Sequence, residues 1–336
     1  MPFIVISIAV AFLPLNYFSF RVWEALSVCR GYFLSGPFYP NQKVAMIEEG
    51  DMGHGTPYAI KKNVYWETDR HGYRKTDSND HLDIVIIGDS TIAGSSLTQE
   101  DIISDVLQRK LQRSVYPYAP SDINNFIHDT RFTINPPRVV ILGGIEREIF
   151  AYKRLQITPK VRRTIKSKMN SLINSKGYSI RVAIVLDRIL KCELLSYLRA
   201  QIEPTTIGVR YRGMFFYQGP AAVTSAQDSE ILNTIQIIRE YNDFFKHNNI
   251  LFIYMPIPNK ETIYYDFLPT RPKVSIINQV LTGLRHTGIP TIDLLSAFGA
   301  YRQDAGNPFQ IDDTHWNATG VKIAAELIAD KIHNSE

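Results

Sequence analysis

Residues 82–90 read Leu-Asp-Ile-Val-Ile-Ile-Gly-Asp-Ser, and this stretch decides the fold. Its apolar, β-branched run ends at Gly88, which is typical of a strand buried on both faces of a parallel sheet. Open α/β sheets bind their ligands beyond the carboxyl ends of the strands. We therefore expect Ser90 to lie at the functional edge of such a sheet.

Beyond this strand the chain alternates between strand and helix patterns. The expected strands are 83–87, 115–118, 138–142, 250–255 and 291–294, and the expected helices are 99–111, 123–130, 226–247, 273–286 and 318–333. The alternation predicts a flavodoxin-like three-layer α/β/α sandwich with a five-stranded parallel sheet. Two more helices, 161–173 and 180–197, belong to an expected helical insertion at about 151–225, which we expect to cover or border the active site.

Composition divides the rest of the chain into a membrane-proximal part (1–30), a loop-rich lead-in (31–80) with an edge strand at 59–66, and a catalytic domain (81–336). The apolar segment 2–18 approaches the length of a membrane span and lacks the basic start and cleavage site of a secretory signal. It predicts an uncleaved signal anchor, with the catalytic domain in the cell envelope on the extracytoplasmic side. A buried N-terminal helix is the alternative.

The charge and cysteine content narrow the classes of partner and cofactor. A net charge of +4, without a Gly/Arg-rich tail or an aromatic-basic stripe, does not favour nucleic acid. The acid-free, basic stretch 151–186 fits a solvated helix face or a surface that meets anionic lipid or an acidic glycan. Cys29 and Cys192 lack metal-ligand spacing, and no phosphate-binding glycine loop is present. No metal or organic cofactor is expected.

A second informative segment, Asp-Asp-Thr-His-Trp-Asn at 312–317, lies near the other end of the chain. A serine is a weak nucleophile until a base removes its proton, and a histidine held by a carboxylate is such a base. Ser90 and His315, together with Asp312 or Asp313, are therefore the predicted catalytic triad of a hydrolase or acyltransferase.

The two segments together resemble the SGNH, or GDSL, hydrolase superfamily, in which Gly-Asp-Ser follows the first strand and Asp-x-x-His stands before the last helix. The tetrad 313–316, Asp-Thr-His-Trp, looks like the signature of AlgX/AlgJ-type SGNH proteins, which O-acetylate extracellular polysaccharides. The strand 138–147, which ends in Glu-Arg, is similar to that subgroup's strand. Residues 68–74, Thr-Asp-Arg-His-Gly-Tyr-Arg, are like a lead-in common in cell-surface SGNH proteins.

The resemblance leaves the acidic member of the triad open. Superfamily spacing points to Asp312, whereas the subgroup signature points to Asp313. In the subgroup this segment precedes the serine, but here it follows Ser90, as in ordinary members. On that order we favour Asp312.

Three positions are expected to shape the oxyanion site besides the Ser90 N–H. Gly94 is a candidate second backbone donor. The asparagine that usually follows the third strand is replaced by Gly144, Glu146 and Arg147. Arg147 is expected to stabilise the oxyanion or hold an acidic sugar, and Glu146 to pair with it.

Two residues that flank the triad have proposed roles of their own. Asp89 is expected to orient the turn that carries the nucleophile. Trp316 is either a platform for a sugar ring or a packing residue.

Three functions fit these features. The first is an envelope acyltransferase that O-acetylates a polysaccharide through acetyl-Ser90, for which the resemblance implies an acyl donor, a polysaccharide acceptor and a membrane-bound O-acyltransferase as partners. The second is an esterase that deacylates glycans or lipids with the same triad. The third is a non-catalytic subunit that binds polysaccharide.

Overall fold

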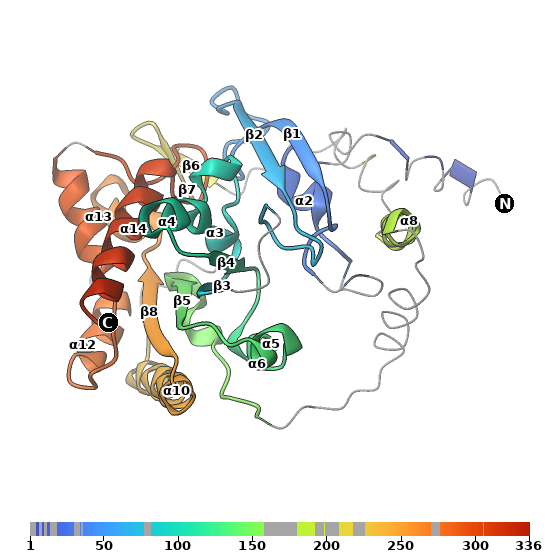
Figure 1. The fold of residues 1–336 in the computed structure, drawn as a ribbon. Coiled ribbons are helices and arrows are strands. Elements are labelled where there is room, and N and C mark those ends of the chain that lie inside the picture. The colour runs from blue at the N-terminus through green and yellow to red at the C-terminus, as the bar shows by residue number, and fades with distance from the viewer. Residues whose placement is uncertain are drawn as a thin grey trace.

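A four-stranded parallel sheet forms the centre of the protein (Figure 1). The computed structural model describes residues 5–6, 9, 12–13, 19–29, 34, 36–76, 82–157, 180–191, 198, 208–217, 226–269, 276–304 and 306–336. The strands are β3 (Ile84–Gly88), β4 (Val115–Tyr118), β5 (Val139–Ile145) and β8 (Leu251–Ile257), in the order β4-β3-β5-β8. The chain order reverses between β3 and β5, so the ends of these two strands flank the crevice where such sheets bind ligands.

The prediction of five strands is wrong by one. The expected strand at 291–294 is reduced to a single parallel bridge between Tyr254 and Thr291. Pro290 has no N–H to donate to a ladder. Only three residues later Asp293 caps the next helix, its side chain accepting a hydrogen bond from Ser296 N. The segment therefore has no room to extend along β8.

Helices cover both faces of the sheet, as predicted. One face packs against α4 (Ile103–Leu111), α13 (Leu294–Gln303) and α14 (Ala318–His333), and the other against α5 (Ile123–Ile127), α6 (Thr130–Ile134), α10 (Asp228–His247) and α12 (Ile276–Leu284). Alternation along β3 explains this arrangement: Ile84 and Ile86 belong to the first core, whereas Val85 and Ile87 belong to the second.

Short elements complete the edge of the sheet where the strands end. They are α3 (Ser90–Ala93), η2 (Gln99–Asp101), η3 (Glu146–Ala151), α11 (Lys260–Ile263) and η4 (Tyr265–Phe267). The helix expected at 99–111 is thus divided into η2 and α4, because Ile102 has an extended backbone with ψ near 150°. The final helix, α14, begins as predicted, with the Asn317 side chain accepting from the N–H groups of Thr319 and Gly320.

The lead-in is part of the same folded unit as the sheet. It contains an antiparallel pair, β1 (Lys43–Glu48) and β2 (Lys62–Glu67), the second of which corresponds to the expected edge strand. The helix α2 (Val22–Leu26) precedes it, in the part of the chain expected to be membrane-proximal. Val22, Phe38 and Trp66 are fully buried and belong to the same hydrophobic core cluster as residues of α4 and α14. In the described part of the chain, no helix has the length and apolar character needed to cross a membrane. The signal anchor stays a prediction.

The insertion contains α8 (Ile180–Leu190) and an antiparallel hairpin of β6 (Gly208–Tyr211) and β7 (Met214–Tyr217). Asp187 on α8 accepts hydrogen bonds from Cys29 N at 3.1 Å and from Tyr39 Oη at 2.9 Å, which fixes this helix to the lead-in. Phe215 N donates to Ile311 O at 2.9 Å, so β7 supports the loop that precedes α14. The helix expected at 161–173 lies outside the described residues.

Candidate active site

Ser90 lies at the start of α3, directly beyond the carboxyl end of β3. Asp89 caps this helix: its Oδ1 accepts from Thr91 N at 2.7 Å. Its Oδ2 accepts from Ile145 N at 3.0 Å and so fastens the turn to the end of β5. Gly88 permits this approach, because a Cβ there would lie 2.2 Å from Gly143 O. Asp89 thus orients the turn that presents Ser90.

Ser90, His315 and Asp313 form a continuous chain of hydrogen bonds. His315 Nε2 lies 2.8 Å from Ser90 Oγ, and His315 Nδ1 lies 2.5 Å from Asp313 Oδ1. Because the carboxylate can only accept, the proton between them is on Nδ1, which leaves the Nε2 lone pair for the Ser90 hydroxyl. Burial alone would raise the pKa of Asp313, but the charge and hydrogen bond of His315 hold it well below its ordinary value. This is the arrangement of a serine nucleophile, a general base and an orienting carboxylate.

The preference for Asp312 as the acid of this chain is corrected. Its Oδ2 accepts from Gly50 N at 3.0 Å and from Ile60 N at 2.8 Å, and its Oδ1 lies 3.7 Å from Lys62 Nζ. The two adjacent carboxylates therefore point in different directions. Asp312 holds the connection between β1 and β2, and Asp313 faces the imidazole.

Asp51 is a second carboxylate beside the imidazole, and sequence reasoning missed it. It accepts from Thr314 N at 2.8 Å and from Thr314 Oγ1 at 2.6 Å, and its Oδ2 lies 3.8 Å from His315 Nδ1. Burial, followed by the charge of Asp313, raises the pKa of Asp51. Arg21 Nη1 lies 3.4 Å from this carboxylate. Asp51 stands in a loop without a recognisable pattern, so no sequence signal could have found it.

Lys260, the first residue of α11, holds the loop that carries Asp313 by hydrogen bonds to its backbone. Its ammonium group donates to the backbone oxygens of Gln310 at 2.5 Å, Ile311 at 2.9 Å and Asp313 at 3.2 Å. All three N–H groups of one buried side chain are thus used on one loop. Burial lowers the pKa of Lys260 to about 8.

The lead-in segment 68–74 holds the C-terminal end of α3, the helix that begins with Ser90. Arg74 is fully buried, lies 3.8 Å over the Trp66 ring, and donates to the backbone oxygens of Gly94 and of Leu97. Asp69 holds the turn before it by accepting from Tyr73 N at 2.9 Å. Arg74 therefore positions α3, which carries Ser90, and does not face the site.

Gly94 is not an oxyanion donor, which corrects the expectation. Its N–H donates to Thr91 O at 3.1 Å and closes the C-terminal end of α3. Its φ of 76° is left-handed, and a Cβ would lie 2.4 Å from Ile102 Cγ2. Glycine is needed at this position for the turn and the packing.

Gly144 and Glu146 have structural roles at the end of β5. A Cβ on Gly144 would lie 1.9 Å from Tyr152 Oη, so the glycine leaves room for that hydroxyl. Glu146 is buried and accepts from Asn259 N at 3.1 Å and from the Thr262 hydroxyl, which joins β5 to the start of α11.

The neighbouring Arg147 is partly exposed at the start of η3. Burial raises the pKa of the adjacent Glu148, and the positive charge of Arg147 opposes part of that rise. Among the residues that the structure describes, no contact directs Arg147 to the oxyanion, and its proposed roles there and with an acidic sugar stay predictions.

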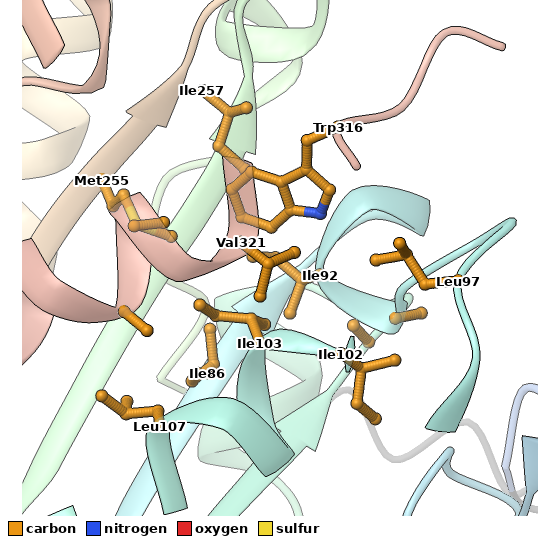
Figure 2. Packing of buried hydrophobic residues seen from close by; sticks show 14 of the residues in the cluster. Ile86, Ile92, Leu97, Ile102, Ile103, Leu107, Met255, Ile257, Trp316 and Val321 are labelled. Atoms are coloured by element: carbon orange, nitrogen blue, oxygen red, sulfur yellow. The ribbon is translucent and has the colours of Figure 1, made fainter. Parts of the chain in front are cut away.

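Trp316 is a packing residue, and the alternative of a sugar platform is wrong. It has no solvent-exposed surface. Figure 2 shows its indole among Ile92, Met255, Ile257 and Val321. A ring enclosed in this way helps to hold His315 next to the core.

A cavity of about 230 Å³ lies beside the nucleophile turn. It is bounded by the ends of β3 and β5, the loop after β4 and the element η3. Its lining residues are Gly88, Asp89, Pro120, Ser121, Asp122, Ile123, Asn124, Leu142, Gly143, Gly144, Glu148, Ala151, Tyr152, Lys153 and Tyr241. Asp89, the residue before Ser90 in the chain, is therefore part of the cavity wall, as is Gly144 at the end of β5.

Asp51, Asp313 and His315 bring three possible metal-ligand atoms within 4.8 Å of one another. Those atoms take part in the hydrogen bonds described above, which join the loop of residues 312–315 to the lead-in. The structure thus gives this group a role in holding the imidazole.

Comparison with known families agrees with this geometry. Residues 212–336, which contain the His315 loop, match the model of the SGNH hydrolase-like domain of the acetyltransferase AlgX. This C-terminal part of the chain is therefore similar to an AlgX-type SGNH hydrolase-like domain. Among curated proteins, none matches the chain.

Solved structures of distant relatives show low similarity. A putative lipolytic protein of the G-D-S-L family from Desulfitobacterium hafniense DCB-2 has 12% identity and a TM-score of 0.37, covering 75% of this chain and 99% of its own. A putative acylhydrolase from Bacteroides fragilis NCTC 9343 has 13% identity and a TM-score of 0.35, covering 78% and 91%. A family two carbohydrate esterase from Clostridium thermocellum, in complex with cellohexaose, has 12% identity and a TM-score of 0.32, covering 90% and 93%. These likenesses are too distant to carry an inference about this chain.

Proposed function

We propose that this protein is a cell-envelope serine acyltransferase that O-acetylates a polysaccharide through an acetyl-Ser90 intermediate. The observation that carries the proposal is the hydrogen-bonded chain from Asp313 through His315 to Ser90, within a domain of the AlgX type. The donor side is proposed to involve a membrane-bound O-acyltransferase, and the N-terminal apolar segment to keep the enzyme at the membrane.

In the first half-reaction, His315 Nε2 takes the proton of Ser90 Oγ as the oxygen attacks the acetyl carbonyl of the donor. The Ser90 N–H is the expected donor to the oxyanion. Collapse of the tetrahedral intermediate breaks the bond to the leaving group, which receives the proton from Nε2. Asp313 stabilises the imidazolium that forms in between, and Ser90 is left as an acetyl ester.

The second half-reaction runs in the opposite direction with a sugar hydroxyl as acceptor. His315 Nε2 removes the hydroxyl proton, the sugar oxygen bonds to the acetyl carbon, and Ser90 Oγ leaves and regains its proton. Water in place of the sugar would give an esterase with the same three residues. The identity of the second nucleophile is therefore the property to measure.

The test uses the full-length protein and p-nitrophenyl acetate, with nitrophenol release and intact mass followed together. One acetyl adduct is expected on the wild type and on Ser229→Ala, an exposed serine of α10 that serves as a matched control, but not on Ser90→Ala or His315→Ala. Faster loss of the adduct when sugars are added, with acetylated sugar as product, supports the transferase. Loss of the adduct at the same rate with or without sugars supports the esterase. A folded wild-type protein that forms no adduct would contradict both the transferase and the esterase.

A further inference from the structure

The cavity that Gly88 and Asp89 of the nucleophile turn help to line is larger than an acetyl group. At roughly 30 Å³ per water molecule, its volume of about 230 Å³ corresponds to about eight waters. An acetyl group has only three heavy atoms, and its carbonyl must stay at the nucleophile. The remaining space is on the scale of one ring of a glycan chain.

The apolar part of the lining is partly aromatic. Tyr152 and Tyr241 contribute rings, and Ile123 and Leu142 contribute aliphatic surface. The Tyr241 hydroxyl donates to Lys153 O, and this side chain is only 2% exposed, so it forms part of the cavity wall. The Tyr152 hydroxyl is packed against Gly144, which leaves the half-buried Tyr152 ring as the aromatic surface for a ligand. Aromatic rings beside polar groups suit the C–H surface of a sugar.

The polar part of the lining is acidic. It contains the carboxylates of Asp89, Asp122 and Glu148 and the single ammonium group of Lys153. Asp89 accepts hydrogen bonds from two backbone N–H groups. Asp122 accepts from Asn125 N at 2.8 Å and lies 4.0 Å from Lys153 Nζ, so both carboxylates already have partners within the protein.

Glu148 differs from the other two carboxylates. Within the part of the chain that the structure describes, it makes no hydrogen bond or ion pair. Burial and then the charge of Asp89 raise its pKa, and its charge also acts on His315. Glu148 is an exposed residue of the cavity lining, so its oxygens are available to a ligand.

These features exclude two other occupants on chemical grounds. A long acyl chain in the cavity would desolvate Glu148 without giving it a hydrogen bond, which is costly. A uronic acid would place its carboxylate among three others, and of the described residues at the cavity Lys153 and the nearby Arg147 are the cations that would oppose this repulsion. A neutral sugar instead offers hydroxyl donors to Glu148 and C–H surface to the Tyr152 ring.

We propose that this cavity is the acceptor subsite of the enzyme, that it takes one neutral sugar unit, and that Glu148 determines the preference for neutral over anionic acceptors. This proposal rests on the acyltransferase function proposed above. It assigns to the carboxylate of Glu148 the recognition of a sugar hydroxyl next to the one that is acetylated.

The experiment isolates the second half-reaction. The full-length enzyme is acetylated with p-nitrophenyl acetate, and the acetyl-Ser90 mass is followed after addition of methyl glucoside or of methyl glucuronide at equal concentration. Acetylated sugar is measured in the same samples. Transfer to the neutral sugar is expected to be at least about tenfold faster than transfer to the anionic one. In Glu148→Gln this ratio is expected to fall by about tenfold, while Glu326→Gln, an exposed residue of α14, keeps it.

The outcomes separate the two proposals. A wild-type enzyme that transfers equally well to both sugars overturns the subsite, and so does a ratio that Glu148→Gln leaves unchanged. An adduct that decays at one rate with either sugar or with neither overturns the acyltransferase itself. A neutral preference that depends on Glu148 supports both.

Discussion

Replacing Asp313 by asparagine should slow the acylation of Ser90 by about a thousandfold, whereas the same change at Asp312 should not. The carboxylate of Asp313 faces an imidazolium in the transition state, with 2.5 Å between Oδ1 and Nδ1. Taking about 4 Å between the charge centres and an effective dielectric constant of about 20, their attraction is about 4 kcal/mol. At 1.36 kcal/mol for each factor of ten, its loss corresponds to roughly a thousandfold.

The two substitutions are matched, because both aspartates are buried and both accept from backbone N–H groups. Each variant should therefore lose stability, by about 1–3 kcal/mol for every buried donor left unpaired. Only Asp313→Asn should also disturb the tautomer of His315. The difference between the variants is the signature of the triad.

The assay is the pre-steady-state release of nitrophenol from p-nitrophenyl acetate, with the unfolding transition of each variant measured alongside. Asp312→Asn is expected to acylate within about tenfold of the wild type once correctly folded enzyme is counted. A loss of less than tenfold in Asp313→Asn would refute the assignment. An equal loss in two folded variants would also refute it, since it would mean that both carboxylates act on the imidazole.

Three further outcomes follow from the structure. Burial lowers the pKa of Lys260 from 10.5 to about 8, so between these pH values the unfolded chain binds a proton at Lys260 that the folded chain has lost. The free energy of unfolding should therefore rise with pH across this window, by up to about 3 kcal/mol from this group. Denaturation curves at several pH values should show this rise in the wild type and in the exposed control Lys322→Met, and its loss in Lys260→Met; an unchanged slope in Lys260→Met would contradict the account. Trp316→Ala should cost about 3–5 kcal/mol of unfolding free energy, because the indole is enclosed in the core, and a variant of normal stability with weakened sugar binding would restore the platform role. Arg74→Met should lower the melting temperature and slow acylation together, because α3 loses its donors, and calorimetry beside the nitrophenol assay would show whether one changes without the other.

Much of the fold could be predicted from local pattern. In the run 84–87 every residue is apolar, which predicts a strand whose two faces are both buried, as observed for β3. The spacing of apolar residues in 318–333 predicts the last helix with its observed ends. Turn residues mark where these elements stop. Such signals are carried by neighbours in the chain, so they survive without knowledge of the tertiary structure.

The expected fifth strand shows where local pattern is insufficient. Residues 291–294 have strand-like composition, but a strand exists only as far as its partner can pair with it. Pro290 and the capping residue Asp293 limit the contact to Thr291. The length of a strand is therefore decided by both partners and by the next element.

The sequence by itself determined the sheet, the position of Ser90 at its edge and the presence of a histidine with an adjacent carboxylate. It could not decide between Asp312 and Asp313, because they are adjacent residues of the same type. Their side chains point in different directions, which the sequence does not show. The direction was decided by partners far away in the chain: the backbone of Asp51 and the hydroxyl of Ser96 for Asp313, and the N–H groups of Gly50 and Ile60 for Asp312. Only the folded chain brings these groups together, because hydrogen bonds between distant segments depend on packing and leave no periodic trace in the sequence.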